Sequence, residues 1–409
     1  MRSSWLFACS MLVAGAAHSA PLTYQGALTL ADQTAPGLQA KALGARAARS
    51  AAIAAGRLPD PKLEFGVEGF PISGPFAGRP ERDDFSDTRL GVMQEVPNGA
   101  KRQSQRERAA ADIGAAEVSL KAQAREVRLG AALAWIDLYY AERRLAALDD
   151  INQTLTKLRA AAPSELASGA KRPGQTLQPE QLIAALDDRR ADLVAAVTTA
   201  RAVLARWTGD SQAEVAGEPP AYTIDPAALR AGVDQLPALT GYDAMGRQAD
   251  ADVNAAKADR HSDWSWELAW QHRDPRFGDM VMVQATVSLP LFASTRQDPI
   301  IAARQDTANG VRLDREAARR ELLAALDASL ADHAMHHDRL HRALDTLVPL
   351  AKRRAELETA SYAAGTASLS DVLDAELSLA EAVTDALDRQ ADVAKDGARI
   401  LLTYGIDPQ

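Results

Sequence analysis

Apolar residues along the chain follow two spacings, one typical of helices and one typical of strands. Long stretches with helical spacing cover roughly residues 22–58, 100–162, 237–260, 298–361 and 376–403. Between them lie four short runs in which apolar and polar residues alternate, at about 63–68, 89–96, 264–271 and 281–289. Successive side chains point to opposite faces of a strand, so each run predicts a strand with one apolar and one polar face.

Tryptophans gather on one face of the third alternating run. Trp264, Trp266 and Trp270 share that face with Leu268, whereas Glu267 and its polar neighbours lie on the other. A soluble sheet would pack an apolar face against a helix, while a row of aromatic side chains suits the lipid-facing girdle of a membrane sheet. We therefore expect these three tryptophans to face lipid.

The same order of elements occurs twice. Residues 20–213 and 237–409 each contain a helix, a strand pair, a long helix, a tip and a closing helix, and the segment 214–236 connects them outside the helices. Self-similarity of this kind indicates an internal duplication. The strand pairs and helical tips are expected at about 62–97 and 163–182 in the first repeat, and at about 262–292 and 362–374 in the second.

Four strands are too few to close a barrel. An open strand edge in lipid leaves backbone donors and acceptors unpaired at a cost of several kcal/mol each, and the smallest common transmembrane barrels have about eight strands. If these strands enter a membrane, identical chains must therefore pool their strand pairs. The strand spacing by itself allows either two or three chains.

A short turn separates the last two helices. Residues 362–375 read Tyr-Ala-Ala-Gly-Thr-Ala-Ser-Leu-Ser-Asp-Val-Leu-Asp-Ala. Gly365 can adopt a left-handed backbone there, and the small hydroxyl residues after it can cap a new helix. This is the tip of a helical hairpin. Its pattern strongly resembles the periplasmic tip of TolC-like outer-membrane efflux channels, and the resemblance extends from about Leu22 to Gly405.

The resemblance implies a mainly α-helical fold with a transmembrane β-barrel. Three chains would form one twelve-stranded barrel, continued by a tunnel of twelve helices across the periplasm. Asp371 and Asp374 would ring the closed mouth of that tunnel and form its gate. A periplasmic adaptor would dock at tip residues Gly365, Thr366, Ser368 and Leu369 and, in the first repeat, Gly169.

One feature of the tip at 362–374 departs from the family that it resembles. In its drug-exporting members, a basic residue two places after the tip glycine ties neighbouring helices together. Here that place holds Ala367, so we expect this latch to be absent. In the first tip, either Gln175 or Glu180 could correspond to Asp371. The short length of the chain and the closing stretch Arg206–Gly209 look closer to the heavy-metal (CzcC-like) branch of the family than to its drug-exporting branch.

The first residues predict a secretory signal peptide at 1–19. Arg2 supplies the positive charge, Trp5 to Val13 the apolar core, and small residues the cleavage site. The only cysteine, Cys9, lies inside this segment, and we expect neither a lipid anchor nor disulfides. Since no later run approaches 18 apolar residues, any passage through a membrane is expected to use strands.

No catalytic motif is evident, so we expect neither an enzyme nor a cofactor. The net charge of −9 argues against a nucleic-acid partner. Four histidines share one helical face, which permits a metal site but is more typical of a solvated surface, because no carboxylate pattern supports them. They are His333, His336, His337 and His341.

Together with these patterns, the resemblance implies a trimeric outer-membrane channel of a tripartite, RND-type efflux system. It would be a passive conduit gated at its periplasmic tip, with an adaptor and an inner-membrane pump as partners and heavy-metal cations as a candidate cargo. Two alternatives within export stay open, a drug exporter and the outlet of a type I protein-secretion system. An alternative of another class is a soluble periplasmic helical scaffold or adaptor.

Overall fold

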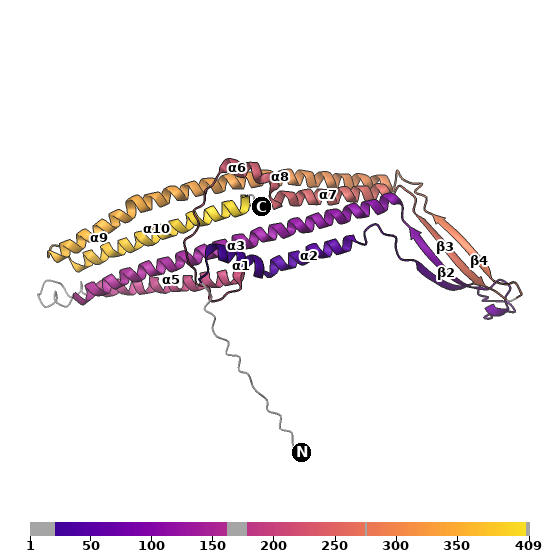
Figure 1. Ribbon diagram of the computed structural model, residues 1–409, viewed down its shortest axis with the longest axis horizontal. Coiled ribbons are helices and arrows are strands. Elements are labelled where there is room, and N and C mark those ends of the chain that lie inside the picture. The colour runs from indigo at the N-terminus through magenta and orange to yellow at the C-terminus, as the bar shows by residue number, and fades with distance from the viewer. Residues whose placement is uncertain (1–20, 162–177, 275, 406–409) are drawn as a thin grey trace, which may run out of the picture. The chain divides into compact units, whose positions relative to one another are not determined.

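The computed structural model describes residues 21–161, 178–274 and 276–405 (Figure 1). They divide into two compact units. We call the first the helical unit; its described residues lie within 21–35, 126–224 and 328–403. We call the second the sheet unit; its described residues lie within 36–125, 225–327 and 404–405.

Almost all regular structure in the helical unit is α-helix. Two long helices, α3 and α8, contribute residues to both units. The helices that supply residues to the helical unit are α1 (Tyr24–Thr34), α3 (Gly99–Ala161), α5 (Gln178–Thr208), α8 (Gln297–Arg342), α9 (Val348–Ala363) and α10 (Leu369–Tyr404). The predicted helix at 100–162 is confirmed by α3.

Aromatic packing on α3 forms the core of the helical unit. Trp135 is fully buried, its ring stacks on Tyr139 with centroids 5.4 Å apart, and its indole N–H donates to the Leu22 carbonyl at 2.8 Å. Tyr222, from the connecting segment, donates its hydroxyl hydrogen to the Tyr24 hydroxyl at 2.7 Å. Buried aromatic rings with satisfied polar atoms hold the connecting segment and the start of the chain onto α3.

The predicted single helix at 22–58 is wrong in one respect. It is two helices, α1 and α2 (Pro36–Ala52), with Ala35 between them in an extended backbone conformation. The proline ring disfavours helical geometry in the residue before it, so a helix cannot run through Ala35 into Pro36.

A π-helical turn interrupts the helical stretch just before Pro349. Residues Ala343–Leu347 form this turn between α8 and α9. Proline has no N–H, and its ring collides with the carbonyl four residues earlier, here that of Asp345. A wider turn accommodates the ring without ending the helix.

The sheet unit combines helices with one antiparallel sheet. Its four strands are hydrogen-bonded in the order β1-β2-β3-β4. They are β1 (Lys62–Glu68), β2 (Asp87–Val96), β3 (Trp264–His272) and β4 (Met280–Val287), which confirms the four predicted strands. The helices are α2, the first part of α3, the short α6 (Pro226–Gly232), α7 (Pro237–Ala258) and the first part of α8, with 3-10 turns at Pro80–Arg82 and Val233–Gln235.

Each strand pair lies between two helices along the chain, α2 and α3 for the first and α7 and α8 for the second. Within the sheet unit, Arg108 of α3 pairs with Asp252 of α7 at 2.5 Å, and Arg315 of α8 pairs with Asp243 of α7 at 2.6 Å. Among the described residues, no helix is both long enough and apolar enough to cross a membrane.

Gly130 tests the close packing inside the helical unit. A Cβ added at Gly130 would stand 2.3 Å from Cζ2 of Trp207, far inside van der Waals contact. We expect Gly130→Ala to lower the free energy of unfolding by about 1–3 kcal/mol through overpacking, as measured by chemical denaturation. Gly310→Ala on α8, where a Cβ meets nothing within 4 Å, is the control and should be neutral or stabilising by up to about 1 kcal/mol. Equal effects of the two substitutions would contradict the packing argument.

Candidate functional site

The sheet turns its apolar face outward. On β3, Trp264, Trp266 and Trp270 are 54%, 48% and 43% exposed, whereas Glu267 and Gln271 on the opposite face are only 6% and 8% exposed. In a half-buried soluble sheet the apolar face packs on the core and the polar face meets water. On β3 the arrangement is reversed, because the tryptophan face is about half exposed and the face with Glu267 and Gln271 is buried.

Apolar side chains form two rows across all four strands. One row follows the register Phe65, Leu90, Trp270 and Val281. The other consists of Leu63, Val92, Leu268 and Val283. Every member of both rows is at least 43% exposed. A continuous apolar band of this kind needs an apolar environment to cover it.

Charged side chains on the opposite face pair with one another. Arg89 of β2 pairs with Glu68 at 2.6 Å and also with Glu267, and Arg89 and Glu267 are largely shielded from solvent. Gly91 leaves room beside this cluster, since a Cβ there would stand 2.8 Å from Glu267 Oε1. Charges held this way are paired and hydrogen-bonded, so their burial does not leave an isolated ion.

The turn at 364–368 is built as the sequence predicts. Gly365 has a φ of +76°, the left-handed region that costs glycine little. The Thr366 backbone N–H donates to the Ser361 carbonyl at 2.9 Å, and the Thr366 hydroxyl donates to the same carbonyl at 3.0 Å. These bonds close the end of α9 and reverse the chain into α10.

A reciprocal capping box starts α10. The backbone N–H and the hydroxyl of Ser368 donate to Asp371 Oδ2 at 2.8 and 2.7 Å, while the Asp371 N–H faces Ser368 Oγ at 3.3 Å. A negative charge in the first turn also suits the positive end of the helix dipole. The Asp371 carboxylate therefore has a structural task. Asp374, one turn further on, is exposed and projects from the same stretch of α10.

The predicted docking residues at this tip fall into two groups. Gly365 and Thr366 are exposed and Ser368 is half-buried. Leu369 is only 3% exposed and packs with Leu148, Leu186 and Leu373 in a buried cluster. Its side chain joins the two helical hairpins, so the prediction that Leu369 contacts a partner is not supported by its position.

The first-repeat tip lies largely outside the described residues. This applies to Gly169, the docking residue predicted there, and to Gln175, one of the two candidates for a match to Asp371. Glu180 is described and lies exposed in the first turn of α5.

The four histidines of α8 do not form one site. His336 Nδ1 lies 2.6 Å from Asp396 Oδ2 of α10. His333 is half-buried, and its burial lowers its pKa. His337 and His341 are exposed, with ring centroids 4.7 Å apart. Among the described residues, no group of three or more histidine, cysteine or carboxylate side chains could hold a metal ion.

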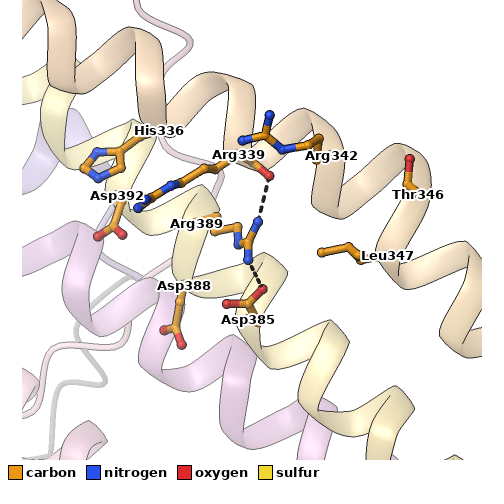
Figure 2. Close-up of a pocket in the computed structure, with 9 residues that line it drawn as sticks. All are labelled: His336, Arg339, Arg342, Thr346, Leu347, Asp385, Asp388, Arg389 and Asp392. Atoms are coloured by element: carbon orange, nitrogen blue, oxygen red, sulfur yellow. Dashed lines mark hydrogen bonds and ion pairs between the residues drawn. The ribbon is translucent and has the colours of Figure 1, made fainter.

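A charged groove lies between α8 and α10 in the helical unit (Figure 2). Its volume is about 630 Å³. Arg389 crosses it, donating to the Arg339 carbonyl at 3.0 Å and pairing with Asp385 at 2.7 Å. The groove is lined by His336, Arg339, Arg342, Thr346, Leu347, Asp385, Asp388, Arg389 and Asp392. Basic residues of α8 on one wall and acidic residues of α10 on the other favour contacts with charged groups over an apolar ligand.

Glu376 is a carboxylate that the sequence pattern does not single out. It lies half-buried on α10, five residues after Asp371, and burial raises its pKa above the usual 4.5. The sequence alone places Glu376 on α10 close to Asp371 and Asp374. Its burial, however, depends on how α10 packs against other helices.

Comparison with known proteins identifies the fold. No family model matches the chain, and no curated protein matches its sequence. The solved structures that each match 93% of the chain include three channel proteins. One is CusC, whose structures describe transmembrane channel formation (TM-score 0.79, 16% identity, 92% of that chain). The others are the CmeC outer membrane channel of Campylobacter jejuni (0.79, 13%, 85%) and the open-state MtrE outer membrane channel of Neisseria gonorrhoeae (0.75, 17%, 88%). Identities this low show a shared fold.

The capping box gives a prediction for the tip. Asp371→Ala removes the acceptor for two hydrogens of Ser368, so we expect the first turn of α10 to lose about 1 kcal/mol of local stability. Hydrogen exchange of backbone amides at the start of α10 would report this as faster exchange. Asp374→Ala is the matched control and should leave these rates almost unchanged. Equal exchange rates in the two variants would contradict the capping role.

Glu376 gives a prediction for pH dependence. Its raised folded-state pKa means that its charge destabilises the folded protein at neutral pH, and that this cost disappears once pH falls below 4.5. Glu376→Gln should therefore raise the unfolding midpoint at pH 7.5 and lose that advantage by pH 4. Glu381→Gln, at an exposed position of the same helix, controls for the amide itself. A gain that is the same at both pH values would exclude the burial of the charge as its cause.

Proposed function

We propose that this protein is an outer-membrane channel of a tripartite, RND-type efflux system in a Gram-negative bacterium. The observation that carries the proposal is the reversed sheet, whose apolar face is exposed while Glu267 and Gln271 on the other face of β3 are buried. The fold shared with solved outer-membrane channels supports the same conclusion. The channel would be a passive conduit, with no turnover chemistry of its own, and the predicted signal peptide would direct it out of the cytoplasm.

The channel would be a homotrimer. Among the described residues, β1 pairs with β2 and β4 with β3, and the outer edges of β1 and β4 have no strand partner. Joining β4 of one chain to β1 of the next in three chains would close twelve strands and remove the open edges. Exposed leucines of the π-helical turn and α9 support further contact between copies of the chain. Each of them is at least 43% exposed, and they are Leu344, Leu347, Leu350 and Leu357. The matching order of helices and strands in the two halves supports the proposed duplication.

Gating would occur at the helical tip, which would extend into the periplasm. Carboxylates from three chains would surround a narrow axis, hold the mouth cation-selective and bind divalent ions. Because Asp371 caps its own helix, Asp374 is the better candidate for the gating charge. A periplasmic adaptor would dock around Gly365, Thr366 and Ser368, with Gly169 as the corresponding position in the first repeat, and would move the helix pairs outward.

Heavy-metal cations are the cargo we propose, with drugs and secreted proteins as alternatives. Sensitivity of a deletion strain to zinc, cobalt, cadmium, copper and silver would decide whether metals are exported. A neighbouring gene for an ATP-driven transporter instead of a proton-driven pump would favour protein secretion. The remaining alternative, a periplasmic scaffold or adaptor, leaves the exposed tryptophan face without an environment and is therefore less well supported.

Conductance across planar bilayers tests the channel and its gate. We expect the purified protein to run as a trimer in detergent and to give small, cation-selective currents. Asp374→Ala should raise the single-channel conductance or weaken block by divalent ions, because it removes one carboxylate per chain from the mouth. Asp306→Ala changes an exposed carboxylate on α8 outside the tip and serves as control.

Two results would count against this proposal in different ways. A monomer in the periplasmic fraction without detergent would reject the channel itself. Currents that form normally but do not change with Asp374→Ala would leave the channel standing and reject the gate.

A further inference from the structure

The exposed pair His337 and His341 has the geometry of a metal chelate. The two residues lie four apart on α8, so they are neighbours on one face of the helix. Their ring centroids are 4.7 Å apart and the rings are tilted by 57°. Both side chains are open to solvent, so a hydrated cation can approach them.

The separation of the rings can be compared with what a shared cation needs. A nitrogen ligand lies about 2.0–2.1 Å from a zinc ion, which places each ring centroid about 3.2 Å from the metal. At the observed 4.7 Å between centroids, the angle at the metal is about 95°. That is close to the right angle of two neighbouring ligands in an octahedral or square-planar site. His333 and His337, at 6.1 Å, would require an angle of about 145° and fit poorly.

Asp345 lies where it can orient the ring of His341. Its Oδ2 lies 3.6 Å from His341 Nδ1, on the next turn of the helix. Metal-bound histidines usually direct their second ring nitrogen at a carboxylate or carbonyl, which fixes the tautomer and makes the ligand more basic. With Nδ1 facing Asp345, the Nε2 atom of His341 is left for a metal. Asp345 is part of the π-helical turn, so its placement depends on that turn.

The other two histidines are less open to a hydrated cation. His336 Nδ1 faces Asp396 at 2.6 Å, and His333 is half-buried. The pair therefore stands as a two-imidazole site, in keeping with the absence, among the described residues, of any group of three or more ligands. Asp338 and Asp345 add negative charge beside it, against the positive charge of Arg342.

We propose that His337 and His341 bind a divalent transition-metal ion such as Cu²⁺, Ni²⁺ or Zn²⁺, with water in the remaining positions and Asp345 orienting His341. Imidazole nitrogen suits these ions better than Mg²⁺ or Ca²⁺, which prefer oxygen. The site goes beyond the channel function and does not depend on it, since a helix surface binds the ion whether or not a pore forms.

Copper binding to the purified, metal-stripped full chain in detergent tests the site. We expect one Cu²⁺ per chain by calorimetry, with two nitrogen ligands in the electron paramagnetic resonance spectrum. His337→Gln and His341→Gln should each weaken binding at least tenfold and reduce the spectrum to one nitrogen. Asp345→Asn should keep both nitrogens and weaken binding several-fold.

His333→Gln and His272→Gln are the controls. His272 lies on the sheet beside Asp279, far along the chain from α8, and both control variants should bind copper as the unmodified protein does. The proposal is overturned if the unmodified protein does not bind copper, if His337→Gln and His341→Gln bind it normally, or if His333→Gln loses as much affinity as they do. Single-channel currents of the same variants report separately on the pore.

Discussion

The organisation of this protein depends on one small sheet, whose outer strand edges need hydrogen-bond partners and whose apolar face needs an apolar cover. Four antiparallel strands satisfy each other's inner edges, while the side chains of the apolar rows from Phe65 to Val281 and from Leu63 to Val283 are each at least 43% exposed. A surface of this size and composition is costly in water. In the proposed channel, lipid on one face and identical strands at both edges would remove the two costs together, so membrane insertion and assembly would be a single requirement.

The helical tip shows how local structure constrains a functional charge. Asp371 is one of the two residues that a resemblance to known channels places at the gate, yet its carboxylate accepts two hydrogen bonds from Ser368 and starts α10. Leu369, next to the cap, is buried among leucines of three helices and fixes the position of the turn. The tip can therefore present Asp374 to solvent because its neighbours hold the hairpin end in place.

The π-helical turn before Pro349 positions polar side chains at the end of α8. The turn keeps the helix continuous past a proline and brings Thr346 and Leu347 to the groove that faces α10. It also carries Asp345, which faces His341. A residue whose ring is incompatible with an ordinary helix thus produces a widened turn, and the widened turn positions the carboxylate and the groove. Wide turns of this kind are frequent at functional positions in helices.

The sequence alone determined the local elements, because they depend on short-range rules. Alternation in 62–68 and 264–272, the glycine at 365 and the hydroxyl at 368 specify strands, a reversal and a cap through residues close in the chain. Proline at 36 was equally readable, and its effect on Ala35 could have been predicted. Only the tertiary structure decided which groups are covered. Leu369 and Glu376 are covered by residues of other helices, His336 has a partner on α10, and Arg89 pairs with Glu267. These contacts join residues far apart in sequence, and helical or strand periodicity carries no information about them.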